Sequence, residues 1–338
     1  MKIVFLKWKR KKYLILGAVI ILIFFYVINF TSLKHSQTDF SYLRLPNDNL
    51  PELTQTNLEE LPDSGLDKIP RIIHQTWKTA DIPDLYIDWI KSWHTLNPDW
   101  EYWFWTDENT RAFIAQKYPW FLDVFDNYPE PIRRADSMRY FILYEFGGVY
   151  VDLDMENLKS LSPLIKKYYC FLGQEPYVHP MIDSNFEHLP INAIMGCRKG
   201  HPFMKLLMDQ LPKFSNMWHV LDSTGPHFMR LWFKDYKKYN YNAEHENGTF
   251  LTPPEWFFPF VDPVKIKDFH AKCSKYDSLL HHQKRACQFI KEYNGVPSNL
   301  KHAFTNHHWI HTYFISRYSL QPPRNIHSIV PSVKIWKP

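Results

Sequence analysis

Cysteine is scarce in this chain, with four residues among 338. Four cysteines are too few for the disulfide framework that stabilises many small secreted domains, although they suit an oxidising compartment. The sequence also has no Gly-x-y period and no internal repeat, which excludes collagen-like and repeat architectures. Hydrophobic residues make up 45% of the chain, so a mainly disordered protein is excluded and a sizeable core is possible.

Excess charge of one sign is missing outside the first twelve residues. Those residues hold six Lys or Arg and no acidic residue, whereas the remaining chain has 34 basic and 35 acidic residues. The body of the protein therefore has a net charge of −1, although the whole chain has +5. A balanced body gives no argument for nucleic-acid binding, which needs a basic surface.

One long hydrophobic run follows the basic cluster. No charged residue occurs from Tyr13 to Leu33, about 21 residues that would form a helix of roughly 31 Å. This length matches the hydrocarbon core of a bilayer, and the residues that follow do not form a small-x-small cleavage site. We therefore predict a cytosolic tail at 1–12 and a transmembrane signal anchor at 13–33. The positive charge before the anchor predicts type II topology, with the rest of the chain in the secretory lumen.

The remaining chain divides into a stem, one domain and a tail. Residues 34–68 are polar, contain three prolines and show no period, as expected of a lumenal stem. From Ile69, short apolar strands alternate with amphipathic helices, which predicts an α/β domain with a mostly parallel central sheet over 69–325. Residues 326–338 are interpreted as a C-terminal tail.

Five elements of this domain can be predicted from the sequence pattern. Strands are expected at 69–77, 100–105 and 149–154, and a helix is expected at 82–96. Another helix is expected to begin at Pro131 and to end at the Gly147-Gly148 pair, because proline favours the first turn and glycine follows the last.

Cys273 and Cys287 lie in one polar segment and could close a disulfide loop of about 14 residues, with two buried thiols as the alternative. A zinc site that uses the intervening His281 or His282 would lack a paired C-x-x-C and is disfavoured. The sequon at Asn247 lies in a stretch rich in Tyr, Asn and Lys, so this stretch is predicted to be an N-glycosylated surface loop.

Asp152 and Asp154 are separated by one residue at the end of the strand predicted at 149–154. A period of two places both carboxylates on one face and Leu153 in the core. Two carboxylates at the carboxyl end of a strand can hold Mg²⁺ or Mn²⁺ while the metal still accepts diphosphate oxygens. The alternative is a solvated turn, because a D-x-D triplet often arises by chance.

Three charged residues, Arg133, Asp136 and Arg139, lie on the helix expected to begin at Pro131. Asp136 and Arg139 are three positions apart and can share a face. Because most of the other residues of this helix are apolar, we interpret the pair as a sugar- and phosphate-binding pair. The alternative is an ordinary surface ion pair, which would contribute little.

Four segments together carry a family resemblance, namely Ile69–Trp77, Arg134–Tyr140, Gly147–Asp154 and Ser223–Pro226. In this order, over about residues 69–315, they resemble the D-x-D sugar-transferase family 32. That family includes initiating α-1,6-mannosyltransferases, inositol-phosphorylceramide mannosyltransferases, and α-1,4-galactosyl- and α-1,4-N-acetylglucosaminyltransferases. The run from Tyr118 to Arg134 most resembles the sphingolipid mannosyltransferase branch.

The resemblance implies a GT-A fold, a nucleotide-sugar donor (GDP-mannose or a UDP-sugar), a bound Mn²⁺ or Mg²⁺, and retention of anomeric configuration. The function expected from it is transfer of a hexose, with mannose favoured, to a lipid or glycan acceptor at the Golgi membrane. A UDP-galactose- or UDP-N-acetylglucosamine-dependent α-1,4-transferase stays open, as does an inactive, membrane-tethered protein that only binds a sugar nucleotide. An aspartyl-phosphate phosphatase is disfavoured, because Glu156 stands where that chemistry needs Thr or Val.

The resemblance also assigns roles to single residues. Trp77 would stack on the nucleotide base, Asp136 and Arg139 would hold the donor sugar, and Arg139 would also lie near the diphosphate. Asp152 would contact the ribose or the sugar as well as the metal, and Asp154 would ligate the metal directly. This arrangement suits the chemistry, because charge develops on the departing nucleoside diphosphate.

A third metal ligand is expected near the C-terminus, where Asn306–Tyr313 resembles the family's terminal His-x-Trp segment. His307 is the first choice and His308 the second, and His311 stays open. Aromatic packing or an exposed position is the alternative for these histidines.

The acceptor side is assigned to three short segments that contain Glu175, Asn192 and Thr224. Turn formation alone would also explain the glycine and proline residues of these segments.

Overall fold

The computed structural model of the chain describes residues 61–62, 64–184, 188–239, 241–293, 300–311 and 322–338. The predicted cytosolic tail, the anchor at 13–33 and almost all of the stem lie outside these residues. Among the described residues, no helix combines the length and the apolar character that crossing a bilayer requires.

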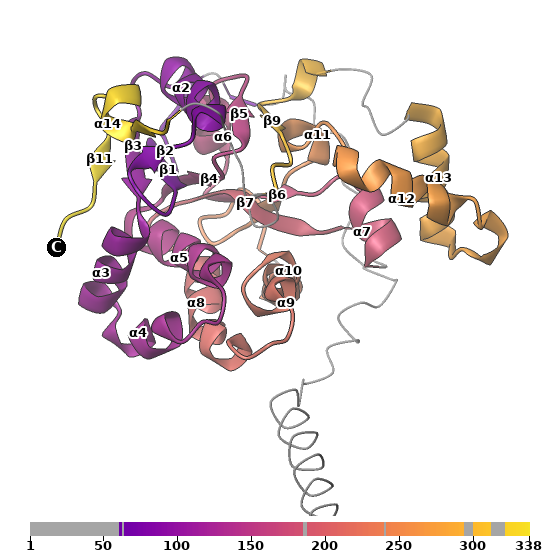
Figure 1. Ribbon diagram of the computed structural model, residues 1–338, viewed down its shortest axis with the longest axis horizontal. Coiled ribbons are helices and arrows are strands. Elements are labelled where there is room, and N and C mark those ends of the chain that lie inside the picture. Colours follow the sequence, from indigo (N-terminus) through magenta and orange to yellow (C-terminus); the bar gives the residue numbers. More distant parts are fainter. Residues whose placement is uncertain (1–60, 63, 185–187, 240, 294–299, 312–321) are drawn as a thin grey trace, which may run out of the picture. The chain divides into compact units, whose positions relative to one another are not determined.

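A seven-stranded mixed sheet forms the centre of the fold, with the order β11-β3-β1-β4-β7-β6-β8 (Figure 1). Its strands are β1 (Ile72–Thr76), β3 (Glu101–Trp105), β4 (Gly148–Val151), β6 (Cys170–Gln174), β7 (Pro190–Cys197), β8 (Phe250–Leu251) and β11 (Lys334–Ile335). β11, β3, β1 and β4 are parallel neighbours, β7 is antiparallel to both β4 and β6, and β6 is parallel to β8. The predicted α/β class with a mostly parallel sheet is therefore confirmed, with a reversal at β7.

Two short antiparallel pairs lie outside the central sheet. They are β2 (Asp81–Ile82) with β10 (Arg324–Asn325), and β5 (Met155–Asn157) with β9 (Thr305–His307). The second pair joins the middle of the chain to its C-terminal part and later proves central to the site.

Helices cover both faces of the sheet. Figure 1 shows α5, α8 and α10 below the sheet and α2 and α6 above it. The α-helices are α2 (Ile87–Leu96), α3 (Asp107–Lys117), α4 (Pro119–Asp126), α5 (Pro131–Phe146), α6 (Ser162–Lys167), α7 (Val178–Asp183), α8 (Pro202–Phe214), α9 (Val220–Ser223), α10 (Pro226–Tyr236), α11 (Pro254–Phe257), α12 (Pro263–Cys273), α13 (His281–Tyr293) and α14 (Ile326–Ile329). The 3₁₀ turns are η3 (Asp84–Tyr86), η4 (Lys237–Tyr239), η5 (Tyr276–Ser278) and η6 (Leu300–His302).

Burial on both faces explains the composition of the inner strands. All eight residues of β7 are buried, as are all four of β4, and both strands are apolar rather than alternating, with Asn192 of β7 as the exception. The core beside them is rich in aromatic side chains such as Trp93, Phe104 and Trp256. The indole N–H of Trp93 donates to the carbonyl of Met155 at 2.7 Å, which fixes α2 against β5.

Helix α5 begins and ends as the sequence predicts. Pro131 occupies its first turn, and Gly147 follows Phe146 with φ +69°. A Cβ atom at Gly147 would stand 2.6 Å from the backbone nitrogen of Lys199, so this position requires glycine for space as well as for conformation. The tight turn delivers the chain directly into β4, whose end carries the D-x-D pair.

Three predicted boundaries differ from the structure. The helix expected at 82–96 begins only at Ile87, because Ile82 pairs with β10 and Pro83 precedes a 3₁₀ turn. The strand expected to reach residue 154 ends at Val151, and the backbone N–H of Met155 then donates to the carbonyl of Asp152 in a turn. Residues 326–338, interpreted as a tail, contribute β11, which pairs with β3.

Two disulfides are present, and none of the four cysteines is free. Cys273–Cys287 joins α12 to α13 and is the pair that the sequence indicated. Cys170–Cys197 was not predicted and joins the first residue of β6 to the last residue of β7. These two residues are register partners, so only knowledge of the strand pairing could have revealed the bond.

Candidate active site

A buried arginine lies between two aspartates at the carboxyl end of β4. The Nη2 atom of Arg139 is 3.2 Å from Oδ1 of Asp136 and 3.2 Å from Oδ1 of Asp152. Its Nη1 donates to the carbonyl of Asn192 at 2.8 Å, and the guanidinium lies 4.7 Å from the centre of the Tyr150 ring. Burial opposes the charge of Arg139, but the carboxylates outweigh it and raise the pKa of the guanidinium. A permanent cation therefore links α5 to the D-x-D turn.

Asp136 is held by two further side chains. The amide of Asn192 donates to Oδ1 at 3.0 Å, and the hydroxyl of Thr224 donates to Oδ2 at 3.0 Å. Burial raises the pKa of Asp136, while Arg139 and these hydrogen bonds counteract the rise. Asn192 and Thr224 were expected on the acceptor side; both donate to the carboxylate assigned to the donor sugar, and their place beside the acceptor stays a prediction.

Asp152, the first aspartate of the D-x-D pair, lies near the cation of Arg139 and the carboxylate of Asp154. Its Oδ1 accepts a hydrogen bond of 2.8 Å from the Tyr150 hydroxyl. Burial raises the pKa of Asp152 to about 6, against the effect of Arg139 and with a contribution from Asp154. Its backbone carbonyl accepts from the side chain of Gln75 at 3.2 Å, which fixes the turn to β1.

The second aspartate faces a histidine from the other half of the chain. Met155 and His307 are register partners in the β5–β9 pair, and Nε2 of His307 lies 3.4 Å from Oδ1 of Asp154. The backbone N–H of Ile310 donates to the other oxygen at 2.8 Å. Burial would raise the pKa of Asp154, but His307 outweighs it and the pKa is lowered. Conversely, burial would lower the pKa of His307, but Asp154 outweighs it and the pKa is raised.

The donor atoms of Asp152, Asp154 and His307 fit a divalent cation. One ligand atom from each residue lies within 4.8 Å of the others, and two carboxylates with one imidazole are suitable ligands for Mn²⁺. Nδ1 of His307 accepts a hydrogen bond from the backbone N–H of Trp309, so the neutral ring carries its proton on Nε2. Ligation through Nε2 therefore requires this proton to leave and the Trp309 contact to be released.

The two other candidate histidines face away from the D-x-D pair. His308 pairs with Glu156 at 3.0 Å and stacks on Trp89 with ring centres 4.0 Å apart. His311 pairs with Asp262 at 2.9 Å. The backbone N–H of His308 donates to the carbonyl of Asp154 at 2.9 Å, but it is the imidazole of His307 that lies against the Asp154 carboxylate.

Two other residues that the sequence singled out lie apart from this cluster. Arg133 pairs with Glu130 and donates to the backbone carbonyls of Met217 and Trp218, so it anchors a loop. Trp77 is half-buried, with its ring centre 5.3 Å from that of Tyr86. Its stacking on a nucleotide base stays a prediction.

Sequence reasoning missed Gln75 and Tyr150 as positioning residues. Gln75 is itself held by the hydroxyl of Tyr102, and it precedes the Thr-Trp pair of the first motif. Tyr150 lies two residues before Asp152, where the alternation of the strand directs both side chains to one side. That alternation was a usable signal for Tyr150, whereas the contact of Gln75 depends on tertiary packing.

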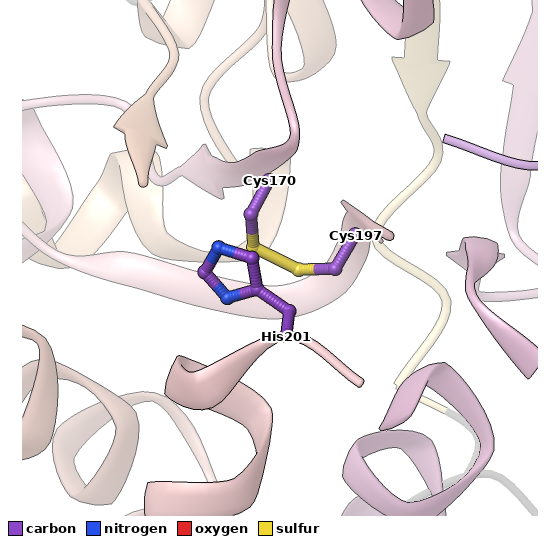
Figure 2. A group of neighbouring side chains, drawn as sticks. All are labelled: Cys170, Cys197 and His201. Atoms are coloured by element: carbon purple, nitrogen blue, oxygen red, sulfur yellow. A yellow bond between two sulfur atoms is a disulfide. The ribbon is translucent and has the colours of Figure 1, made fainter. Parts of the chain in front are cut away.

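A second group of potential metal ligands, Cys170, Cys197 and His201, cannot hold an ion in this state (Figure 2). The two sulfur atoms are bonded to each other. His201 donates from Nε2 to the carbonyl of Gly248 at 3.1 Å, and its Nδ1 accepts from the backbone N–H of Phe203 at 3.2 Å. Burial lowers the pKa of His201 to about 3, so it is a neutral structural residue.

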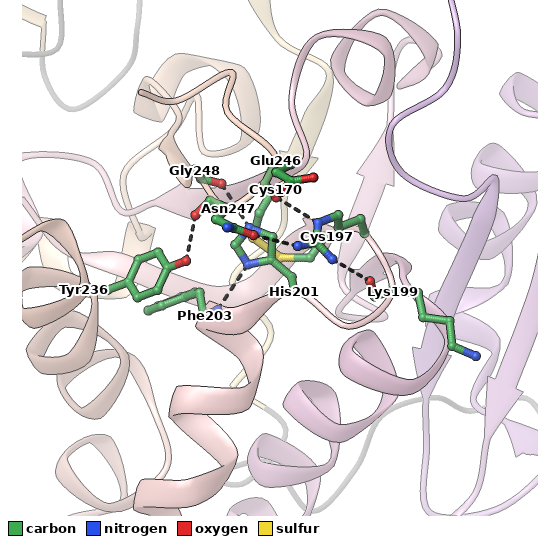
Figure 3. The surroundings of a disulfide bond; sticks show 10 residues. Cys170, Cys197, Lys199, His201, Phe203, Tyr236, Glu246, Asn247 and Gly248 are labelled. Carbon is green, nitrogen blue, oxygen red and sulfur yellow. Dashed lines mark hydrogen bonds between the residues drawn. A yellow bond between two sulfur atoms is a disulfide. The ribbon is translucent and has the colours of Figure 1, made fainter. Parts of the chain in front are cut away.

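The predicted glycosylation site lies next to this disulfide. Figure 3 shows Asn247, whose side-chain oxygen accepts from Arg198 at 2.7 Å. Asn247 is partly exposed, whereas Thr249 of the same sequon is buried. Attachment of a glycan at Asn247 stays a prediction.

A D-x-D pair at the end of an inner strand of an α/β sheet, joined to a buried Arg–Asp pair, defines a sugar-transferring enzyme of the D-x-D class. Residues 83–171 match the family described as "Glycosyltransferase sugar-binding region containing DXD motif". The chain is 35% identical over 275 residues to inositol phosphoceramide mannosyltransferase 3 of Schizosaccharomyces pombe, and the alignment covers 76% of this chain and 68% of that protein. The chain belongs to this family, glycosyltransferase family 32, and is a glycosyltransferase.

Two further relatives support the family assignment. The chain is 35% identical to mannosyl phosphorylinositol ceramide synthase SUR1 of Saccharomyces cerevisiae, over 65% of this chain and 56% of that protein. It is also 35% identical to the initiation-specific alpha-1,6-mannosyltransferase of Candida albicans, over 28% of this chain and 27% of that protein. The chain thus spans between about a quarter and two thirds of the length of these curated relatives.

Two solved glycosyltransferase structures resemble the chain distantly. The PaToxG glycosyltransferase aligns with a TM-score of 0.37 and 16% identity, over 66% of this chain and 80% of that one. The galactosyltransferase LgtC aligns with a TM-score of 0.34 and 12% identity, over 71% of this chain and 87% of that one. At these scores the likenesses carry no argument about the site.

Proposed function

We propose that this glycosyltransferase moves mannose from GDP-mannose to a lipid acceptor with an inositol phosphate headgroup, on a GT-A fold and with retention of configuration. The names of the relatives from Schizosaccharomyces pombe and Saccharomyces cerevisiae support the choice of sugar and acceptor. The observation that carries the proposal is the continuous cluster in which Arg139 joins Asp136 to Asp152, and His307 adjoins Asp154.

Asp152, Asp154 and His307 would hold the divalent cation, which when bound neutralises charge on the departing nucleoside diphosphate. Arg139 lies 3.2 Å from Asp152, so it supplies a positive charge beside the D-x-D pair. The guanidinium is already in place and does not have to reorient during the reaction. Asp136 is oriented by Asn192 and Thr224, and its remaining acceptor capacity suits a hydroxyl of the donor sugar. Fixing the sugar in this way supplies positioning, which is a large part of the catalytic effect expected for such a transfer.

We further propose that the enzyme resides in the Golgi membrane as a type II protein, with the described domain in the lumen. The uncharged run at 13–33 behind six basic residues supports this topology. The two disulfides suit an oxidising lumen.

The experiment uses the full chain in detergent with Mn²⁺ and a panel of GDP- and UDP-sugars, and follows release of the nucleoside diphosphate. We expect release with GDP-mannose, loss of release with a chelator, and a loss of about 1,000-fold in Asp154→Asn. Asp209→Asn, an exposed aspartate on α8, is the matched control and should retain full activity.

Each other outcome excludes a specific part of the proposal. Turnover of a UDP-sugar in place of GDP-mannose would replace the mannosyltransferase by an α-1,4-galactosyl- or N-acetylglucosaminyltransferase. Donor binding without turnover would identify an inactive sugar-nucleotide-binding protein. Activity that survives both the chelator and Asp154→Asn would exclude the metal site.

A further inference from the structure

A polar cavity of about 250 Å³ lies among α7, α9, α10 and α12. This volume is smaller than that of pockets for drug-sized ligands, so the cavity suits a single small ring. The polar side chains that line it include Glu175, His179, Asp183, His219, His227 and Lys265.

Trp309 connects the cavity to the metal cluster. The ring of His179 contacts Trp309 edge-on with centres 4.8 Å apart, and Trp309 contacts His307 in the same way at 4.3 Å. Trp309 is therefore the single side chain that separates His179 of the cavity lining from His307.

Glu175 is a fixed, ionised hydrogen-bond acceptor at the wall of this cavity. Nε2 of His179 accepts from the backbone N–H of Asp262 at 3.1 Å, so the neutral ring carries its proton on Nδ1. That Nδ1–H donates to Glu175 at 3.1 Å. Burial would raise the pKa of Glu175, but His179, Lys265 and His227 together outweigh it and the pKa is lowered. The carboxylate is thus oriented and has further capacity to accept hydroxyl protons.

The cavity carries no surplus of positive charge. Lys265 is paired with Asp183 at 2.9 Å, and Asp183 also contacts Lys272 at 3.1 Å. His227 donates to Asp222 at 2.9 Å. With Glu175 and Asp183 against Lys265, the lining favours hydroxyl groups and disfavours an anion such as phosphate.

We propose that the cavity is the acceptor subsite and binds an uncharged polyhydroxylated six-membered ring. Glu175 accepts hydrogen bonds from the hydroxyls of this ring, and any phosphate group attached to the ring stays outside the cavity. The identification of the ring as a cyclitol rests on the proposed function, whereas the preference for hydroxyls over an anion rests on the lining alone.

The test is ligand-observed NMR of the full chain with myo-inositol, and separately with inorganic phosphate, each in the presence of saturating GDP. We expect millimolar binding of myo-inositol, as suits a ligand of about twelve heavy atoms, and none of phosphate at this site. Glu175→Gln should weaken the binding of myo-inositol at least tenfold. Glu108→Gln, an exposed glutamate on α3, is the matched control and should leave it unchanged.

The outcomes separate this proposal from the proposed function. If myo-inositol does not bind the unchanged protein, or binds equally well to Glu175→Gln, the acceptor subsite is excluded even if GDP-mannose is turned over. If GDP-mannose is not turned over but myo-inositol binds through Glu175, the subsite stands and the donor assignment fails. Competition of phosphate with myo-inositol would overturn the argument from charge.

A second, independent observation concerns the distribution of charge. Residues 263–293, which form α12, η5 and α13, contain seven Lys or Arg and three Asp or Glu, a net charge of +4. Since residues 13–338 together have a net charge of −1, all other residues of that range have −5. Net positive charge thus lies on one disulfide-bonded pair of helices, in which Lys265 and Lys272 are paired with Asp183 of α7.

The same helical pair exposes apolar side chains. Val264 is 71% exposed and Leu280 is 49% exposed, and both lie close in sequence to lysines, namely Lys267 and Lys275. Apolar side chains beside lysines are typical of surfaces that bind anionic membranes. Through Lys265, α12 also forms one wall of the cavity described above.

We propose that this helical pair docks on the lumenal leaflet of a lipid bilayer where that leaflet presents anionic headgroups. Charge complementarity supports a membrane as the partner, because anionic headgroups attract clustered lysines within about a Debye length. Such docking would hold the mouth of the cavity near lipid headgroups.

The test measures acetylation rates of single lysines by mass spectrometry, with the full chain reconstituted in neutral or in 30% anionic vesicles. We expect Lys267 and Lys275 to be protected several-fold only in anionic vesicles, and the protection to vanish in 1 M salt. Lys91 and Lys205, on α2 and α8, are the internal controls and should react equally in both. Equal rates at Lys267 and Lys275 in the two vesicles would overturn the proposal.

Discussion

At the scale of single residues, the site depends on how a buried carboxylate is kept in one orientation. Asp136 is held by Arg139, Asn192 and Thr224, which come from α5, β7 and the segment before α10. Hydrogen bonds to a charged group contribute more than neutral ones, so each partner matters for the geometry of the donor sugar.

Removing one of these partners should lower activity without unfolding the protein. Thr224→Val deletes the hydrogen bond to Oδ2 of Asp136, and we expect kcat/KM for the donor to fall by about 10- to 100-fold. The matched control is Thr252→Val, which deletes a buried hydroxyl that donates to the carbonyl of Leu172 at 3.1 Å. Steady-state kinetics and thermal unfolding of both variants separate the effects; an equal loss of activity in both would contradict a specific role for Thr224.

At the scale of elements, the turn between α5 and β4 determines where the D-x-D pair lies. Gly147 and Gly148 both have positive φ, and the carbonyl of Gly147 accepts from the buried ring of His74 on β1 at 2.9 Å. The hydrogen bond from His74 therefore fixes the turn to the centre of the sheet. The turn depends on the space that Gly147 leaves free and on the neutral state of the His74 ring.

The first effect is steric, and a pair of glycines can isolate it. Gly147→Ala would place a Cβ 2.6 Å from a backbone nitrogen, whereas Gly200, with a similar φ of +67°, has no atom closer than 4.0 Å. We expect Gly200→Ala to cost about 1 kcal/mol and Gly147→Ala at least about 2 kcal/mol more. Thermal unfolding of the two variants measures the difference in the free energy of unfolding. Equal destabilisation of both would show that the backbone moves to remove the clash without loss of stability.

The second effect depends on pH. Burial lowers the pKa of His74 from 6.5 to about 4, so the unfolded chain takes up the proton first. The contribution of neutral His74 to the free energy of unfolding is present above pH 6.5 and is lost as the pH falls toward 4. Between pH 7 and pH 5 this loss amounts to about 2 kcal/mol. Denaturant unfolding at pH 7 and pH 5 measures how much stability each variant loses between the two. The loss should be smaller by about 2 kcal/mol in His74→Gln than in the unchanged protein. It should be unchanged in His327→Gln, an exposed control. An unchanged pH dependence in His74→Gln would refute this assignment.

Elements with local signals were predictable from the sequence, and contacts between distant segments were not. Pro131 and Gly147 mark both ends of α5 because they act on their own backbone. The pairing of β5 with β9, which brings His307 to Asp154, joins residues about 150 positions apart and has no local signature. For the same reason the sequence could suggest three histidines but could not choose among them by pattern alone.

At the scale of the whole molecule, the two disulfides differ in their access to solvent. Cys170 and Cys197 are fully buried between strands, whereas Cys273 lies at the end of α12 and is partly exposed. Access of a thiolate to the bond controls the rate of exchange.

Mild reduction of the native protein should therefore open one bond first. We expect alkylation and mass spectrometry to find Cys273 and Cys287 modified under native conditions, and Cys170 and Cys197 modified only after a denaturant is added. Modification of all four cysteines at one rate would show that the sheet opens as readily as the helical pair.

The pairing of β5 with β9 also has a consequence for biosynthesis. Asp154 and His307 come from opposite halves of the chain, so a nascent polypeptide has no complete site until its C-terminal part has been synthesised. A sugar nucleotide bound at the completed site, through the cation that Asp154 and His307 would hold, favours the folded state by mass action. We therefore expect the yield of mature enzyme in pulse–chase experiments to fall when cells are starved of the sugar nucleotide. Shortage of substrate would then reduce the amount of the enzyme as well as its rate.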